Sequence, residues 1–546
     1  MRIIYVLMLI TLLSFNNRVV AQSSGFEQIK NLELIDLIYM NLDKYYVDEP
    51  KVGEISKAGI DAMLKELDPY TVFYHESNIE DYRLMTTGQY GGIGALIRKL
   101  DDYIVIAEPY ENMPAHKAGL KAGDKIISID GKSMKNVSSE IVSETLKGPK
   151  DSEFELEIQR PSEAKTRKFT IKRDEIKLPD VPYSGIIDEK SKIGYIKLNS
   201  FTQTASRSVK AAFDELKDEG MESLIFDLRG NGGGLLMEAV NIVNFFVPQN
   251  TEVVTTKGKI IDENRSYKTR NNPVDLDIPI VVLVDGLSAS ASEIVSGSLQ
   301  DLDRGVVIGN TTFGKGLVQR TVDLKYGAKM KLTISKYYTP SGRCVQKLDY
   351  YHKNDGKVDE VPDSLITVFH TKNGREVIDG RGIEPDVSIE LEDLSRLAGV
   401  LIGQNIIFNY ATEFEQKYDK IAEAKDFEIT NQMYNDFKAY VLKQDFEYKT
   451  AAEEQLERTL EIAKREGYAS KINGEYEALH KILGASKEKD LELYEKQIKR
   501  LLAGEIIARY YFQKGQAINA FKEDKALIEG IEILKDTNRY HSILNP

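Results

Sequence analysis

The spacing of apolar residues changes along the chain and predicts four folded regions. In residues 22–87 apolar side chains recur at helical spacing, and in residues 88–176 they form the short runs typical of strands. Residues 177–395 alternate continuous apolar runs with amphipathic patterns, and residues 396–546 are helical and rich in Glu, Lys, Ala and Leu. We therefore expect a multidomain α+β protein, in which helical regions flank a strand-rich domain and an α/β core.

The N-terminal helical region has its apolar positions at Ile29, Leu32, Ile35 and Leu42, among others. We expect most of these side chains to be core rather than binding surface. Asp68-Pro69 ends a second helix, because proline disfavours helical conformation in the residue before it.

Residues 278–319 predict a strand, a turn, a helix start, a second strand and a lysine between two glycines. The run Ile280–Val284 has no polar interruption, which suits a strand covered on both faces. A serine-rich turn follows and leads into a helix near Glu293, and Gly305–Gly309 is the second strand. The polar stretch Asp349–Asp363 is expected to be a surface loop.

Residues 1–21 have the pattern of a signal peptide. Arg2 precedes the apolar run Ile3–Leu13, and Val19-Val20-Ala21 resembles a cleavage site. The run is short for a transmembrane helix, and no cysteine follows that could carry a lipid. We expect an exported protein, in a periplasm or the cell envelope, with cleavage near Ala21; an uncleaved anchor is the alternative.

Composition narrows the possible partners. The net charge of −13 argues against nucleic acid and anionic membrane surfaces as partners. The only cysteine, Cys344, cannot form an internal disulfide or a thiolate metal cluster.

Ser290 and Lys315 are the candidate reacting pair. A serine at a helix start and a lysine framed by glycines suggest a nucleophile and its base, since burial can lower a lysine pKa from roughly 10.4 toward neutrality. Ser-Lys pairs are a known variant of serine hydrolase sites. The alternative is structural, because Ser290-x-x-Glu293 also fits a capping box and Lys315 could be an exposed turn residue.

Two glycine-rich segments imitate nucleotide-binding motifs and fail at a defining position. The turn that begins at Asn231 breaks the dinucleotide pattern G-x-G-x-x-G at Leu235. The segment Gly309–Lys315 matches a P-loop until Gly316, where a magnesium-binding Ser or Thr is required. A nucleotide site is therefore not expected.

The run SASASEIVSGSLQD, followed by TTFGKGLVQ, resembles the C-terminal processing peptidases, also called tail-specific proteases. The resemblance extends over roughly residues 30–390 and implies a protease fold in the α/β core. It implies that Ser290 is the nucleophile, Lys315 the base and Gln319 the residue that orients the amine, and it implies no metal and no organic cofactor. Leu287 stands where the family usually has glycine.

The resemblance also implies an oxyanion hole. The family pattern L-R-x-N-P-G-G-L-L corresponds to the glycine turn here, with Gly232 in place of the proline. We assign one backbone donor to Gly233, with Gly234 as its rival, and the second to Ala291 or Ser290. Glu293 either supports the site or serves only as a cap partner.

The segment from Ala115 to Gly131 resembles a PDZ domain, which predicts a PDZ domain over residues 88–176, inserted between the N-terminal segment and the protease core. A PDZ groove adds a peptide as an extra strand and holds its terminal carboxylate in backbone N–H groups. We assign that role to Gly92, Ile93 and Gly94, and expect Lys147 to face the groove.

Together these features predict an exported serine endopeptidase that binds free C-termini of polypeptides and cleaves nearby. A Ser-His-Asp peptidase and a non-catalytic PDZ scaffold are the alternatives, although none of the six histidines lies in a triad-like motif. The C-terminal helices could pack on the core, self-associate or bind an adaptor.

Overall fold

The computed structural model divides the chain into two compact units. The first comprises Met1–Glu76 with Gln319–Thr333, and the second comprises Ser77–Val318 with Ile334–Pro546. The predicted signal peptide lies outside the described residues. The structure describes residues 25–75, 83, 87–161, 163–354, 357–390, 392–484 and 486–545.

The first unit contains a helix over residues 25–45, helix α2 (Val52–Lys65) and strand β1 (Val72–Tyr74). β1 pairs antiparallel with the first residues of β18 (Lys329–Tyr338). The expectation that most apolar residues of the N-terminal helix are core is wrong for this structure, because many of them are exposed. These include Phe26, Ile29, Leu32, Ile35, Leu37, Ile38 and Met40.

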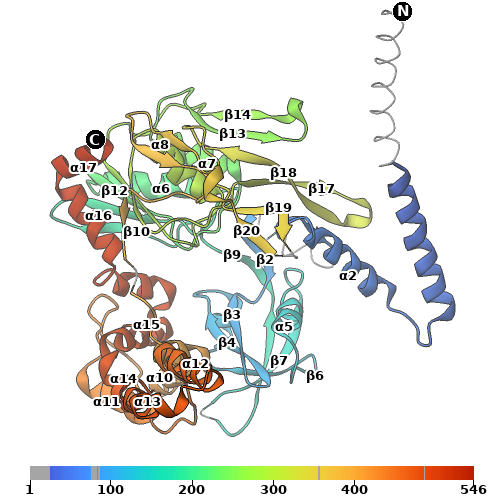
Figure 1. The fold of residues 1–546 in the computed structure, drawn as a ribbon, viewed down its shortest axis with the longest axis vertical. Helices are drawn as coiled ribbons and strands as arrows, with labels where there is room; N and C mark the ends of the chain where they lie inside the picture. Colours follow the sequence, from blue (N-terminus) through green and yellow to red (C-terminus); the bar gives the residue numbers. More distant parts are fainter. Residues whose placement is uncertain are drawn as a thin grey trace, which may run out of the picture. The chain divides into compact units, whose positions relative to one another are not determined.

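The predicted PDZ region of the second unit is an antiparallel sheet in the order β3-β4-β5-β7-β8, with α5 beside β3 (Figure 1). Its core consists of the alternate residues that face inward, such as Ile104, Ile106, Leu156 and Ile158. The elements are β2 (Gln89–Gly92), β3 (Ala95–Leu100), β4 (Tyr103–Pro109), α4 (Pro114–Lys117), β5 (Lys125–Ile129), β6 (Lys132–Ser133), α5 (Ser139–Leu146), β7 (Glu153–Gln159), β8 (Arg167–Lys172) and β9 (Asp174–Lys177).

The α/β core is a six-stranded sheet in the order β10-β11-β12-β15-β16-β23. From β11 to β23 neighbouring strands are parallel, and β10 is antiparallel to β11. The strand predicted at Ile280–Val284 is β15 and is buried throughout. The other strands are β10 (Tyr183–Asp188), β11 (Ile193–Lys197), β12 (Ser223–Asp227), β16 (Val306–Gly309) and β23 (Val387–Ser388).

Helices cover both faces of this sheet (Figure 1). One face packs against α6 (Ala205–Asp218), α7 (Leu236–Val243) and α8 (Ala291–Asp301). The other face packs against the last two helices, α16 (Lys525–Lys535) and α17 (Thr537–Leu544). Coverage on both faces explains why the parallel strands are continuously apolar.

A second sheet and a hairpin complete the core. β13 (Glu252–Gly258) pairs with β14 (Arg265–Lys268) and with the end of β18, and β17 (Leu317–Asp323) pairs with β18. The expected surface loop over Asp349–Asp363 is instead mostly a hairpin of β19 (Leu348–Asn354) and β20 (Lys357–Glu360). The polar residues of this hairpin do not alternate with apolar ones, so its residue pattern carried no strand signal. A hairpin outside the main sheets needs no apolar face.

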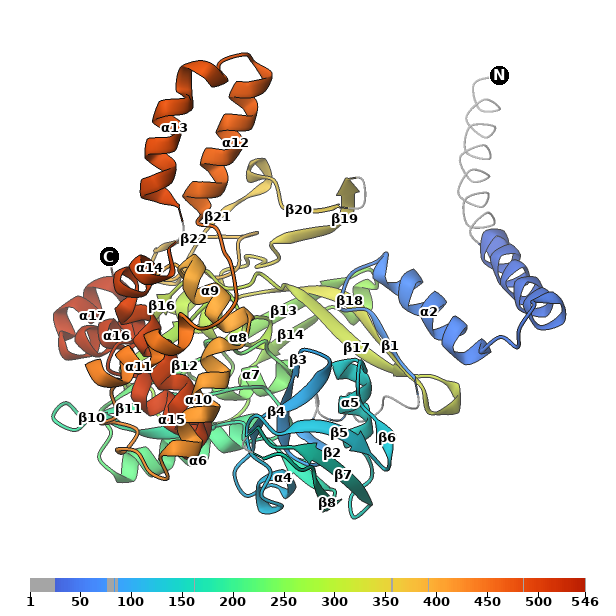
Figure 2. The same cartoon turned by 90° about the horizontal axis from the view of Figure 1, so that it is seen from below.

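The C-terminal helices belong to two different cores. Helices α9 to α11, α14 and α15 share an apolar cluster of their own, whereas α16 and α17 pack on the core sheet. Figure 2 shows α12 and α13 side by side as a helical hairpin. The bounds are α9 (Arg396–Gly403), α10 (Ile406–Lys417), α11 (Asn431–Val441), α12 (Ala451–Arg465), α13 (Ala469–Leu483), α14 (Lys487–Leu493) and α15 (Glu495–Ala520).

Within the described part of the chain, no helix combines the length and the apolar character needed to cross a bilayer.

Candidate active site

Ser290 occupies the turn between β15 and α8, where its backbone is in an unusual conformation. Its φ of 57° and ψ of −110° lie outside the regions that L-residues normally adopt. Such conformations persist only where the surrounding structure enforces them, and they cluster at functional sites. The turn therefore has the strain expected of a residue held in place for chemistry.

The serine-rich turn separates into structural serines and an accessible one. The hydroxyl of Ser288 donates to the carbonyl of Leu228 at 2.9 Å, and the hydroxyl of Ser292 donates to the carbonyl of Asn231 at 2.8 Å. Both side chains are fully buried, whereas Ser290 is partly exposed. Of the three serines, Ser290 is therefore the one that a substrate could reach.

The carboxylate of Glu293 joins the Ser290 turn to the segment that carries Lys315. Its Oε2 accepts the backbone N–H of Ser290 at 2.8 Å and that of Lys315 at 2.9 Å. Its Oε1 accepts the hydroxyl of Thr312 at 2.6 Å and the N–H of Gly314 at 2.7 Å. Glu293 therefore does more than cap α8, because it fixes both backbones to one carboxylate.

Glu293 is completely buried, and burial raises the pKa of its carboxyl group above the ordinary value. The four donated hydrogen bonds oppose that rise, because each favours the ionised form. Burial outweighs these hydrogen bonds, so the pKa of the carboxyl group stays above its ordinary value.

The glycines on each side of Lys315 allow close backbone packing. A Cβ on Gly314 would lie 2.4 Å from the Cβ of Lys347, and a Cβ on Gly316 would lie 2.8 Å from the nitrogen of Gln346. The N–H of Gly316 donates to the side chain of Gln346 at 2.8 Å. The position of the partly buried Lys315 is thus set by neighbours on both sides.

Tyr337, which the sequence analysis did not single out, connects the same two segments. Its N–H donates to the carbonyl of Gly316 at 2.9 Å, and its hydroxyl donates to the carbonyl of Ser290 at 3.2 Å. Burial raises the pKa of this fully buried tyrosine well above its ordinary value, so it remains a donor. Its place in an ordinary strand pattern gave no signal of this contact.

The glycine turn before α7 lies against the turn that carries Ser290, and the contact is at Gly233. A Cβ on Gly233, whose φ is +100°, would meet the Ala289 carbonyl oxygen at 2.7 Å and the Ser290 Cβ at 2.8 Å. A Cβ on Gly234 would instead meet the carbonyl oxygen of Phe201 at 2.4 Å. Of the two rival residues, Gly233 is the one beside Ser290.

The backbone N–H of Gly233 donates to the side-chain oxygen of Asn231 at 2.9 Å in this structure. It is therefore engaged within its own turn. Ala291, the other predicted donor, is the first residue of α8, and its nitrogen lies 3.0 Å from the position that a Gly233 Cβ would take. The two predicted donors thus come from adjoining backbone segments.

Gln319 belongs to the other compact unit, where its side-chain amide donates to the hydroxyl of Thr333 at 3.3 Å. It lies on β17, two residues after that strand begins.

The predicted carboxylate-binding loop immediately precedes β3, the edge strand of the PDZ sheet. Gly94 has a φ of +68°, which favours glycine, and a Cβ there would lie 2.5 Å from that of Met113. The Lys147 ammonium lies 5.8 Å from the ring centre of Tyr90, at the start of the loop. An edge strand with free backbone groups is where a peptide can add as a further strand.

One group in the described residues has the composition of a metal site, namely Glu453, Glu457 and His480 on the α12–α13 hairpin. Lys449 donates to both carboxylate oxygens of Glu457 at 2.7 Å, and His480 lies 3.3 Å from Glu453. These contacts describe an ion-pair network between helices, so we assign no metal to it.

Comparisons with known proteins agree with this architecture. Residues 192–351 match peptidase family S41, residues 83–159 match the PDZ domain, and residues 397–534 match the family described as the probable PDZ-protease C-terminal helical domain.

Curated relatives cover most of the chain. A probable CtpA-like serine protease of Staphylococcus aureus is 33% identical over 412 residues, which is 74% of this chain and 78% of the relative. The corresponding Staphylococcus haemolyticus protein is 32% identical and covers 67% of this chain and 73% of its own length. Among solved structures, a photosystem II D1 C-terminal processing protease is 28% identical, covers 68% of this chain and 90% of its own, and has a TM-score of 0.37. With a relative of one-third identity aligned over most of its length, the chain belongs to peptidase family S41 and is a CtpA-like serine peptidase.

Proposed function

We propose that this protein is an exported endopeptidase that recognises the free C-terminus of polypeptides through its PDZ domain and cleaves near that end. Ser290 acts as nucleophile, Lys315 as general base, and Gln319 orients the lysine amine. The observation that carries the proposal is the shared acceptor: one oxygen of Glu293 holds the backbones of both Ser290 and Lys315. A nucleophile and a base need such fixed geometry to react.

The proposed reaction conserves its protons. Neutral Lys315 takes the hydroxyl proton of Ser290 while the serine oxygen attacks the scissile carbonyl carbon. The protonated lysine then donates to the leaving amine as the C–N bond breaks, which leaves an acyl-serine. Water, deprotonated by the same lysine, hydrolyses that ester and regenerates Ser290.

The oxyanion that forms in each half-reaction requires backbone donors, which we assign to Gly233 and Ala291. The contact of Gly233 with the Ser290 turn supports this assignment. Since the Gly233 N–H donates to Asn231 here, it must share that bond or turn toward the substrate during the reaction.

Recognition of the substrate end rests on the loop Gly92–Gly94 and the free edge of β3. A terminal carboxylate can accept backbone N–H groups from a glycine loop, while the preceding residues pair with β3. Export is supported by the signal-peptide pattern of residues 1–21.

The test is cleavage of an unfolded model protein with a free or an amidated C-terminus, with products mapped by mass. We expect the wild type to cut the free form near its end and the amidated form at least tenfold more slowly, because amidation removes the charge that the loop binds. Ser290→Ala should cut neither. Equal cleavage of both forms would refute C-terminal recognition.

Two alternatives have their own outcomes in the same assay. A non-catalytic scaffold would bind the free C-terminus without cleavage by the wild type. A Ser-His-Asp peptidase would lose activity when the six histidines are replaced, whereas the proposed dyad would not.

A further inference from the structure

The glycine turn that begins at Asn231 follows an ion cluster at the end of β12. Asp227, the last residue of β12, accepts hydrogen bonds from the Tyr195 hydroxyl at 2.7 Å, from the Lys197 ammonium at 3.1 Å and from the guanidinium of Arg229 at 2.6 Å. Burial opposes the charge of Asp227, but Arg229 and Lys197 outweigh it and lower its pKa to about 2. Arg229 is thus held as a cation directly before the turn.

A second carboxylate reaches Arg229 from the far end of the chain. Oδ1 of Asp524 accepts a hydrogen bond from Nη1 of Arg229 at 2.8 Å, and Oδ2 lies 2.7 Å from Nη2 of the same guanidinium. Asp524 also caps α16, where its side chain accepts the N–H of Leu527 at 3.1 Å. Because α16 packs on the core sheet, this carboxylate is fixed by its own helix.

The cluster contains two anions, Asp227 and Asp524, and two cations, Arg229 and Lys197. Removing Asp524 would leave Arg229 with one carboxylate that already accepts from Lys197 and Tyr195. The guanidinium would then keep only its bonds to Asp227 and would lose the anchor on α16. The backbone of Arg229 lies two residues before Asn231, where the glycine turn begins.

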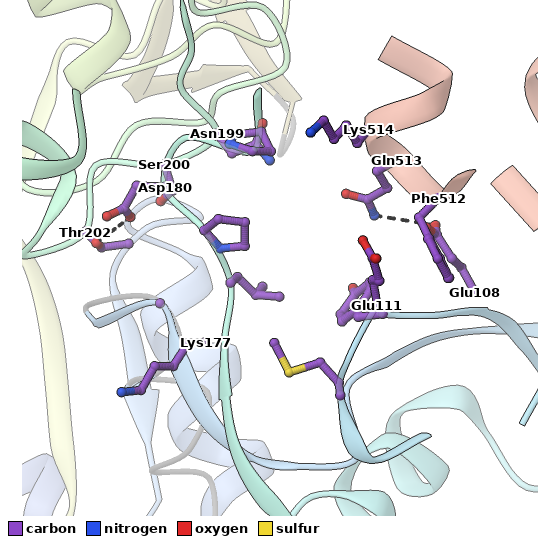
Figure 3. A pocket seen from close by; sticks show the side chains of 16 residues that line it. Glu108, Glu111, Lys177, Asp180, Asn199, Ser200, Thr202, Phe512, Gln513 and Lys514 are labelled. Atoms are coloured by element: carbon purple, nitrogen blue, oxygen red, sulfur yellow. Dashed lines mark hydrogen bonds between the residues drawn. The ribbon is translucent and has the colours of Figure 1, made fainter. Parts of the chain in front are cut away.

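The far end of the turn also lies near the C-terminal chain. The carbonyl of Gly233 accepts the N–H of Phe201 at 3.1 Å and the hydroxyl of Ser200 at 3.5 Å, so these two residues support the turn. Figure 3 shows Asn199 and Ser200 facing Gln513 and Lys514 across a cavity of about 780 Å³. The same C-terminal chain therefore borders both supports of the turn, and Asp524 is bonded directly to one of them, Arg229.

We propose that Asp524 is a positioning residue of the active site, which acts through Arg229 to hold the glycine turn and the Gly233 amide in register with Ser290. The proposal rests on the proposed function, because that function makes the Gly233 amide a donor to the oxyanion. It makes the C-terminal segment part of the catalytic unit, although Asp524 itself touches no substrate.

The test compares Asp524→Asn with Lys535→Met in the full chain. Lys535 lies on the same helix and pairs with Asp188 of the core sheet at 2.9 Å, so its loss removes a matched ion pair that does not touch the glycine turn. Asp524→Asn should lower kcat about tenfold or more with KM changed less than twofold, because oxyanion donors act in the transition state. Asp524→Glu should restore part of that loss, and Lys535→Met should keep wild-type kcat.

Two further readouts separate positioning from general stability. A peptide aldehyde, whose serine adduct bears an oxyanion, should bind Asp524→Asn more weakly in proportion to the loss in kcat. Amide hydrogen exchange over residues 230–235 should quicken at least fivefold in Asp524→Asn and stay unchanged in Lys535→Met. This exchange experiment needs no activity, so it tests the positioning even if the proposed peptidase function fails.

Equal kcat in the two variants, or unchanged exchange in Asp524→Asn, would overturn the proposal. A loss in kcat that merely follows a lower melting temperature in both variants would overturn it as well. If the wild type cut no substrate but exchange over residues 230–235 still quickened in Asp524→Asn alone, the proposed peptidase function would be refuted. The positioning of the turn by Asp524 would be supported.

Discussion

The carboxylate of Glu293 accepts the backbone N–H of Ser290 at 2.8 Å, and it does so from a fully buried position. Glutamine has the same shape but only one acceptor oxygen, and its NH₂ group would face N–H donors that now have an acceptor. We expect Glu293→Gln to lower kcat/KM on the order of 10²-fold, because small displacements of reacting groups have such effects.

The measurement is steady-state cleavage of a peptide substrate by folded protein, with peptide binding to the PDZ domain as the control. Binding should be unchanged, since Glu293 belongs to the protease core. Activity within twofold of the wild type would show that the four hydrogen bonds of Glu293 do not position the site.

The pH dependence of stability should also reveal Glu293. Burial raises the pKa of its carboxyl group. Between the ordinary carboxyl pKa of about 4.3 and the raised value, the folded state binds more protons than the unfolded state. The contribution of Glu293 to stability is therefore fully present below the ordinary pKa and is lost as pH rises through the raised one.

Denaturant unfolding in steps from pH 4 to pH 8 measures this contribution. The wild type should lose more unfolding free energy over that interval than Glu293→Gln, which cannot titrate there. Ser290→Ala keeps the carboxyl group and should follow the wild type. Parallel pH curves for wild type and Glu293→Gln would contradict the raised pKa.

Replacement of the proposed reacting groups should separate chemistry from binding. Ser290→Ala and Lys315→Ala should each lower peptide cleavage at least 10³-fold, because nucleophile and base act as a unit. Affinity for a C-terminal peptide should stay within twofold, since the PDZ loop is untouched. Near-normal turnover of Lys315→Ala would mean that another group is the base.

Sequence patterns predicted the elements that depend on local residue order. The strand Ile280–Val284 is confirmed as β15, because an uninterrupted β-branched run has few other stable environments. The helix that starts beside Ser290 is likewise confirmed as α8. The resemblance selected Ser290 among three serines that local sequence alone cannot distinguish.

What sequence could not predict depends on contacts between distant segments. Ser288 and Ser292 are structural because their hydroxyls meet the carbonyls of Leu228 and Asn231, far away in the chain. The sequence left open whether the C-terminal helices pack on the core, self-associate or bind an adaptor, because periodicity does not identify the partner; α16 packs on the core sheet. The role of Tyr337 was missed for the same reason.

Removal of the Tyr337 hydroxyl should lower activity measurably, but less than Glu293→Gln does. Tyr337→Phe keeps the ring and removes the hydroxyl that donates to the Ser290 carbonyl at 3.2 Å. That carbonyl also accepts the N–H of Ile294, so it keeps one hydrogen bond. We expect a loss of about 1 kcal/mol in unfolding free energy and roughly a threefold lower kcat. A hundredfold loss would show that the hydroxyl has a catalytic role, and calorimetry with steady-state kinetics distinguishes the cases.

Adjacent glycines provide the sharpest test of the glycine turn. A Cβ at Gly233 would lie 2.7 Å from the carbonyl oxygen of Ala289, whereas a Cβ at Gly232 has no heavy atom within 4 Å. Gly233 also has a φ of +100°, which alanine adopts only with strain. We therefore expect Gly233→Ala to push the turn away from Ser290 and to lower kcat at least 10²-fold, comparable to the loss of an oxyanion donor.

Gly232→Ala is the matched control and should retain kcat within a factor of about two. Both variants are measured with the same peptide substrate, and circular dichroism confirms that each is folded. Because the two substitutions add the same methyl group at neighbouring positions, a difference in kcat between them reports on contact with the turn that carries Ser290. Equal activities would mean that the position of Gly233 beside Ser290 has no part in catalysis.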